Sequence, residues 1–121
     1  MTGISDGDRA ALIATAHEMA DAARVATLAH FRRADLSTDN KLGPGGYDPV
    51  TAGDREAESA MRAVLARRRP QDAIIGEEFG AAAGESGLTW VIDPIDGTRA
   101  YVAGTPTWGV LIAVRDETGP L

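Results

Sequence analysis

Two aspartates follow an apolar run in residues 90–104, which read WVIDPIDGTRAYVAG. Residues 90–92 have the composition of a buried strand, and they lead directly into Asp93, a proline and, three residues after the first acid, Asp96. Carboxylates repel one another and cost free energy to remove from water, so protonation or a bound cation has to relieve the repulsion. This stretch therefore favours a fold in which the end of a buried strand presents acids to a positive charge.

The composition narrows the classes of function. A chain of 121 residues is long enough for one domain with a buried core. The net charge of −6 disfavours nucleic-acid binding, and it disfavours an anionic substrate unless bound cations invert the local field. The absence of cysteine excludes disulfides, thiolate zinc sites and cysteine nucleophiles. No signal-peptide pattern and no run of ~20 apolar residues occurs, so we expect a cytoplasmic protein without a membrane partner.

Two amphipathic helices are predicted in the first half of the chain. Apolar residues recur at helical spacing from about Asp8 to Arg32 and again from about Ala52 to Arg68. A loop rich in glycine and proline, residues 41–49, separates them. The predicted buried faces comprise Leu12, Ala16, Met19 and Ala23 in the first helix, and Ala57, Met61, Val64 and Leu65 in the second.

The second half of the chain has the pattern of short strands. We predict strands at 73–75, 89–92 and 107–114, a loop of small residues at 80–87, and a turn at 116–119 that begins a partner strand. Two helices followed by strands predict an α/β or α+β layered sandwich, with the helices packed on a largely antiparallel sheet. The final turn predicts a longer strand than the sequence supplies, so we expect the chain to be a truncated form.

Acids follow two of these predicted strands. Glu77 and Glu78 come after the first strand, and Asp93 comes after the next. If the two strands are neighbours, Glu77 and Asp93 emerge together, with Asp96 one turn further on. Carboxylate oxygens suit a hard cation such as Mg²⁺. Two cations bridged by one aspartate would suit the in-line displacement of a phosphoryl group.

Gly97 and Thr98 are predicted to begin a helical turn over 97–103, whose free N–H groups would favour a phosphate. Each motif also has a purely structural explanation. Asp96 could cap the helical turn, and the two glutamates could be a solvated pair. Thr51 and Asp54 have the spacing of a capping box.

Three motifs together resemble the inositol monophosphatase superfamily: GEE at 76–78, DPIDGT at 93–98, and DPVT at 48–51 followed by Asp54. The segments GEEFG and GTRAYVAGTPTWGVLIAV are most similar to the bacterial branch of histidinol-phosphate phosphatases. The resemblance covers nearly the whole chain but only about the N-terminal half of a family member. It implies that residues 1–121 are the metal-carrying part of an incomplete αβαβα fold.

The resemblance also implies roles for individual residues. Glu77, Asp93 and the backbone carbonyl of Ile95 would bind one Mg²⁺, and Asp93 and Asp96 would bind a second. A complete site would hold two or three ions. Glu78 would support these ligands or bind an accessory ion. Asp54 and Thr98 would orient and activate the attacking water. The N–H groups of Gly97 and Thr98 would bind the phosphate. Lys41 and Asp48 would belong to a mobile loop.

Two hypotheses remain open on the sequence alone, besides a plain structural domain whose acids are caps and turns. The first is a Mg²⁺-dependent phosphate monoester hydrolase. Its leading substrate is histidinol phosphate, followed by inositol phosphate, nucleotide bisphosphates and sugar phosphates. The second is a non-catalytic fragment, or a half-length paralogue, that binds metal or a partner chain through an unfinished sheet. The open sheet edge also predicts self-association, in the simplest case as a homodimer.

Overall fold

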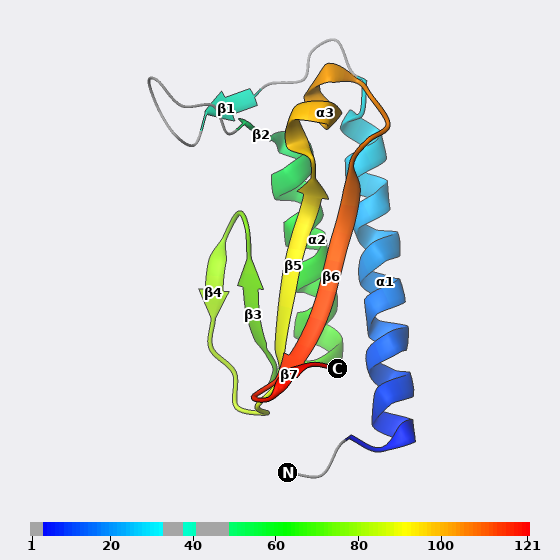
Figure 1. Ribbon diagram of the computed structural model, residues 1–121, viewed down its shortest axis with the longest axis vertical. Coiled ribbons are helices and arrows are strands. Elements are labelled where there is room, and N and C mark those ends of the chain that lie inside the picture. Colours follow the sequence, from blue (N-terminus) through cyan, green and yellow to red (C-terminus); the bar gives the residue numbers. More distant parts are fainter. Residues whose placement is uncertain (1–3, 33–37, 41–48) are drawn as a thin grey trace.

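The computed structural model describes residues 4–32, 38–40 and 49–121 (Figure 1). Two long helices dominate the first half of the chain, and strands with one short helix make up most of the second half. In chain order the elements are α1 (Asp6–His30), β1 (Thr38–Asn40), β2 (Pro49–Thr51), α2 (Ala52–Arg68), β3 (Ala73–Gly76), β4 (Gly80–Ala82), β5 (Thr89–Asp96), α3 (Thr98–Ala103), β6 (Gly109–Asp116) and β7 (Gly119–Pro120).

The main sheet has five strands in the order β4-β3-β5-β6-β7. Three of its four pairings are antiparallel, and β3 pairs with β5 in parallel. The predicted layered fold with a largely antiparallel sheet is therefore confirmed, with one parallel pair at its centre. Because that pair is parallel, the carboxyl ends of β3 and β5 meet at the same edge of the sheet.

Helices α1 and α2 pack against each other and cover one face of this sheet (Figure 1). The alternation of side chains along β5 places Trp90 and Ile92 under the helices, where both are almost completely buried. The buried core cluster is Leu12, Met19, Ala23, Ala57, Met61, Val64, Leu65, Trp90 and Ile92. In the described ranges, no helix is long and apolar enough to cross a membrane.

None of the helices that the structure describes covers the opposite face of the sheet (Figure 1). Ile75, Val91 and Leu111 are exposed there, on three neighbouring strands. This face ends at the edge where the acids of the sequence motifs lie.

The element bounds follow local signals closely at the helices and less closely at the strands. α2 spans the predicted residues because Thr51 and Asp54 form a capping box at its start. α1 begins two residues earlier than predicted because Ser5 caps it, its side chain accepting from the N–H of Asp8. The predicted loop 80–87 contains β4, which pairs with β3 although its residues are only glycine and alanine.

Candidate active site

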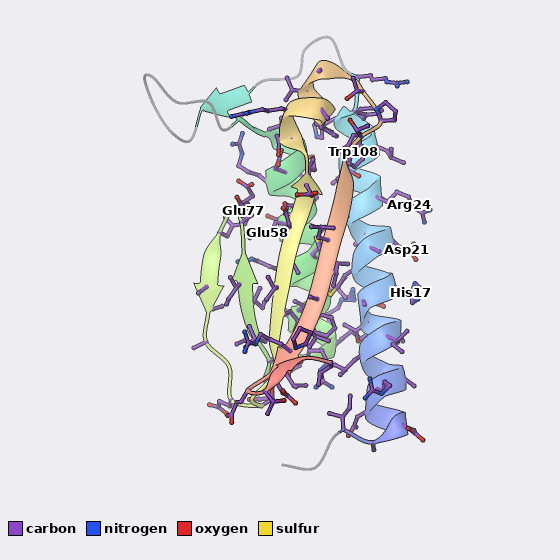
Figure 2. All side chains as sticks on the ribbon, viewed as in Figure 1. His17, Asp21, Arg24, Glu58, Glu77 and Trp108 are labelled. Carbon is purple, nitrogen blue, oxygen red and sulfur yellow. The ribbon has the colours of Figure 1, made fainter. Side chains whose placement is uncertain are left out.

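The carboxyl ends of β3 and β5 bring Glu77 and Asp93 to one edge of the sheet. Gly76 is the register partner of Ile92, so Glu77 and Asp93 are the next residues on their two strands. The N–H of Glu77 donates to the carbonyl of Ile92 at 3.4 Å. Figure 2 shows the Glu77 side chain at this end of β3.

A β-bulge in β5 explains how Asp96 joins the two other acids. Residues three apart on a regular strand point to opposite faces, because side chains alternate. Between Asp93 and Asp96 the register against β6 advances by only two residues, from Leu111 to Gly109, so β5 contains one extra residue. Pro94 fits at this bulge because its missing N–H cannot contribute to the ladder. The predicted strand end at 92 is therefore wrong, since β5 continues through the bulge to Asp96.

The electrostatics of Asp93 show that the acids are close to one another. Burial, followed by the negative charges of Glu77 and Asp96, raises the pKa of Asp93 to about 6. The charge of Asp54 raises this pKa further, whereas a hydrogen bond from the backbone of Ile95 lowers it. The charges of three carboxylates thus act on a fourth, and they disfavour its ionised form unless a cation is present.

Asp54 is held in a fixed position at the start of α2. One of its carboxylate oxygens accepts from the backbone N–H of Thr51 at 2.9 Å and also accepts from the Thr51 hydroxyl. The other oxygen lies 3.1 Å from the hydroxyl of Thr98. Only 1% of the residue is exposed. Asp54 is therefore a capping residue and a hydrogen-bond partner of Thr98 at the same time.

The Thr98 hydroxyl has two acceptors within reach, Asp54 Oδ2 and the carbonyl of Ile95, each at 3.1 Å. A hydroxyl carries a single proton, so it donates to only one of them at a time. Thr98 therefore connects the bulge of β5 to the first turn of α2, and its hydroxyl can change partner without moving the backbone.

Gly97, and not Asp96, is the N-cap of α3, and no side chain caps this helix. The structural explanation of Asp96 as a helix cap is therefore wrong. Gly97 has φ 89°, a conformation that glycine adopts without steric cost, and a Cβ there would lie 2.9 Å from the carbonyl oxygen of Thr107. The close approach of these two backbone segments needs glycine.

Tyr101 ties α3 to the first helix. Its hydroxyl donates to the carbonyl of Thr27 at 2.6 Å, and burial, followed by the charges of Asp54 and Glu56, raises its pKa to about 12. A Cβ at Gly53 would lie 2.7 Å from the Tyr101 hydroxyl oxygen. The absence of a side chain at position 53 therefore makes room for this contact.

Glu58 belongs to the same region, although its sequence pattern does not reveal it. Its side chain is 0% exposed and accepts hydrogen bonds from the N–H groups of Glu78 and Phe79, each at 2.9 Å. An acid on a helix is ordinarily solvated, so the sequence alone does not mark it. The one signal in the sequence that could indicate burial of Glu58 is its position. It lies four residues after Asp54 and directly beside Ala57, on the buried face of the helix.

Two predicted residues, Lys41 and Asp48, lie outside the described residues. Within the described ranges, no group of three or more acidic or histidine side chains has the arrangement of a formed metal site. The charges of Glu77, Asp96 and Asp54 nevertheless all act on Asp93. Their donor set, carboxylates and one backbone carbonyl, consists of the hard oxygen ligands that Mg²⁺ prefers.

Comparison with known proteins identifies the family. The model of the inositol monophosphatase family matches residues 8–121. The chain belongs to this family.

Curated relatives in the family are phosphatases. The chain is 46% identical over 101 residues to a histidinol-phosphatase of Streptomyces coelicolor. This match covers 84% of the chain and 36% of the relative. It is 37% identical over 126 residues to an inositol-1-monophosphatase of Mycobacterium leprae, covering 93% of the chain and 43% of the relative. The chain therefore spans well under half the length of these family members.

Solved structures of the family share the fold. The extragenic suppressor protein suhB of Bartonella henselae superimposes with a TM-score of 0.82 at 26% identity, covering 92% of the chain and 43% of that structure. An inositol monophosphatase of Zymomonas mobilis gives a TM-score of 0.70 at 39% identity, covering 98% of the chain and 43% of that structure. The elements described above are thus a partial family fold.

Proposed function

We propose that this chain carries the metal-binding part of a Mg²⁺-dependent phosphate monoester hydrolase, with histidinol phosphate as the leading substrate. The observation that carries the proposal is the group of acids around Asp93, whose repulsion and burial raise its pKa to about 6. The names and identities of the relatives support the substrate class, with inositol phosphate as the next candidate. The whole protein's activity is part of the proposal, because the chain covers 36% of the Streptomyces relative.

In this proposal Glu77, Asp93, Asp96 and the carbonyl of Ile95 hold the cations, and Glu78 supports them. Bound Mg²⁺ would neutralise charge on the phosphate oxygens during an in-line displacement. The same positive charge would lower the pKa of Asp93 again, because an opposite charge favours the carboxylate.

Asp54 and Thr98 orient and activate the attacking water. The hydroxyl of Thr98 can donate to Asp54 and accept a hydrogen bond from the water, so a proton can pass through it to the free side of the carboxylate. Thr51 occupies the other oxygen of Asp54 and keeps the carboxylate from rotating. The N–H groups of Gly97 and Thr98 bind the phosphate oxygens.

Phosphate release by this chain tests the activity. The substrates are histidinol phosphate, inositol 1-phosphate, a 3′,5′-nucleotide bisphosphate and fructose 1,6-bisphosphate, each with Mg²⁺ and with EDTA. We expect turnover of one ester that EDTA abolishes. Release that persists in EDTA would exclude the metal mechanism.

Asp96→Asn tests the metal assignment directly. We expect it to abolish turnover and to weaken Mg²⁺ binding, measured by titration calorimetry, while the circular dichroism spectrum stays that of the wild type. Asp21→Asn is the matched control, because Asp21 is an exposed aspartate on α1, away from Glu77 in Figure 2. Unchanged activity in Asp96→Asn would remove Asp96 from the site.

The alternative function is binding without catalysis, in which the chain holds metal or a partner chain through its sheet. The observation in its favour is the exposed sheet face of Ile75, Val91 and Leu111, together with the coverage of 36%. Mg²⁺ binding with no release from any of the four esters would favour this alternative.

A further inference from the structure

The carboxylate of Glu58 is buried against the backbone of the turn that carries Glu77. The turn comprises residues 77–79, between β3 and β4, whose register partners Gly76 and Gly80 close it. One Glu58 oxygen accepts from the N–H of Glu78 and the other from the N–H of Phe79, both at 2.9 Å. Two adjacent backbone donors thus converge on one side chain of α2.

Arg62, one helical turn after Glu58 on α2, contacts the same region. Its Nε donates to Glu58 at 3.0 Å, and its terminal Nη2 donates to the carbonyl of Gly80. Its guanidinium carbon also lies 5.9 Å from the centre of the Phe79 ring. The two side chains therefore bind two N–H groups of the turn and the carbonyl of Gly80, the first residue after it, so α2 holds the turn at both points.

Gly76 provides the space for this arrangement. A Cβ at this residue would lie 2.4 Å from Glu58 Oε2 and 2.8 Å from Arg62 Nη2. Gly76 faces the helices, on the same side of the sheet as Ile92, its register partner. The next residue, Glu77, therefore points to the other face, where Asp93 lies. Figure 2 shows Glu58 and Glu77 at this end of β3.

We propose that Glu58 is a positioning residue, which fixes the 77–79 turn so that the Glu77 carboxylate faces Asp93. A carboxylate is suited to this task because it only accepts, and its two oxygens match two N–H donors. Without it, the turn would lose two hydrogen bonds beside a β4 strand that is exposed over its whole length. The metal-related part of this proposal rests on the proposed function, in which Glu77 binds a cation.

Glu58→Gln is the test, measured by amide hydrogen exchange in NMR and by Mg²⁺ titration. Glutamine has the same shape, but it places an NH₂ group against one of the N–H donors. We expect at least a tenfold loss of exchange protection at the amides of Glu78 and Phe79. The amide of Ala73, which donates to Leu88 at the far end of β3, should keep its protection. The Mg²⁺ dissociation constant should rise about 10- to 100-fold, as for other residues that orient metal ligands.

Glu18→Gln is the matched control. Glu18 also pairs with arginines of α2, Arg67 and Arg68, but at the exposed end of the helix. It should change neither the protection of the two turn amides nor the Mg²⁺ affinity. This control separates the loss of a glutamate charge and an ion pair from the loss of the turn contacts.

The outcomes separate this proposal from the proposed function. Unchanged protection of Glu78 and Phe79 in Glu58→Gln would overturn the proposal, as would lost protection with unchanged Mg²⁺ affinity. If the wild-type chain bound no Mg²⁺, the proposed function would fail, and the amide exchange would still decide whether Glu58 holds the turn.

If Glu58→Gln does not fold, Arg62→Lys provides the same test from the other side chain. Arg62 is 20% exposed, and lysine keeps the charge but loses the fork that spans Glu58 and Gly80. We expect a smaller loss of protection at the same two amides, and no loss would overturn the proposal.

Discussion

Asp72, just before β3, is a buried acid that accepts hydrogen bonds from three other side chains. Its carboxylate accepts from Arg69 at 2.7 Å, from the Ser86 hydroxyl at 2.6 Å and from the indole N–H of Trp90 at 2.9 Å. Burial alone would raise its pKa, but these hydrogen bonds and the charge of Arg69 outweigh burial and hold the pKa below the usual range of an aspartate. Asp72 therefore stabilises the folded state in its ionised form.

Asp72→Asn should lower the free energy of unfolding at pH 7 by about 2 kcal/mol, because charged hydrogen bonds are lost. A carboxyl whose pKa is depressed in the folded state stabilises above its unfolded pKa, and this contribution is lost as the pH falls through the folded pKa. The difference between wild type and variant should therefore shrink as the pH falls below the ordinary aspartate pKa of about 3.9. Urea unfolding at several pH values measures this difference in the free energy of unfolding.

The control is Asp21→Asn, because Asp21 and Arg24 form an ion pair with the same three-residue spacing as Arg69 and Asp72. Asp21 is exposed, so its substitution should change stability by less than about 0.5 kcal/mol at any pH. An equal effect of the two substitutions would contradict the assignment of the stabilisation to burial and multiple partners.

At the residue scale, the sequence predicted the acids at strand ends but not the side chains that hold them. Glu77, Asp93 and Asp96 are recognisable because each follows an apolar run or a turn signal. Glu58 lies within a helix, and its partners are backbone groups 20 and 21 residues away. No local pattern encodes such a contact, which depends on how α2 packs on the sheet.

At the scale of elements, the start of α3 depends on one glycine. Gly97→Ala would force alanine into a φ of 89° and place its Cβ 2.9 Å from the carbonyl oxygen of Thr107. We expect the free energy of unfolding to fall by about 3 kcal/mol, the upper range for a strained backbone position. Urea unfolding followed by circular dichroism measures the loss.

Gly87→Ala isolates the contribution of the contact. Gly87 has a similar φ of 85°, and no heavy atom lies within 4 Å of its would-be Cβ. Its substitution should cost only the conformational term, about 1 kcal/mol. If both substitutions had the same effect, the close approach of Thr107 would not contribute.

The strands show where element prediction from sequence stops. The bounds of α2 were predicted because a capping box is encoded within four residues. The end of β5 was not, because a proline normally ends a strand and the bulge that accommodates Pro94 depends on pairing with β6. Likewise the residues of β4 have little intrinsic preference for a strand, and they form one because they pair with β3.

At the scale of the whole molecule, one sheet face is covered by helices and the other is apolar and exposed. Ile75, Val91 and Leu111 are 49%, 39% and 52% exposed on neighbouring strands. Contiguous apolar surface of this kind favours association. Self-association was predicted from the open sheet edge and stays a prediction. The exposed sheet face is a second surface through which two copies of the chain could associate.

Leu111→Lys should weaken self-association without affecting the fold. Burying a leucine contributes ~1.5–3 kcal/mol, so its replacement should raise the dimer dissociation constant about tenfold or more. Analytical ultracentrifugation over a range of concentrations measures this constant. Leu28→Lys is the matched control, because Leu28 is 55% exposed on α1. An equal effect of both variants would point to a general change of charge.

The two tryptophans lie at opposite ends of the antiparallel β5–β6 pair. Trp90 pairs with Val114 in the core beside Asp72, whereas Trp108 precedes Gly109 at the other end, with its ring centre 5.0 Å from that of Tyr101. The molecule thus carries a fluorophore at each end. With either indole replaced by phenylalanine, the emission of the other reports one end alone. Loosening of the α3 end can then be distinguished optically from melting of the core.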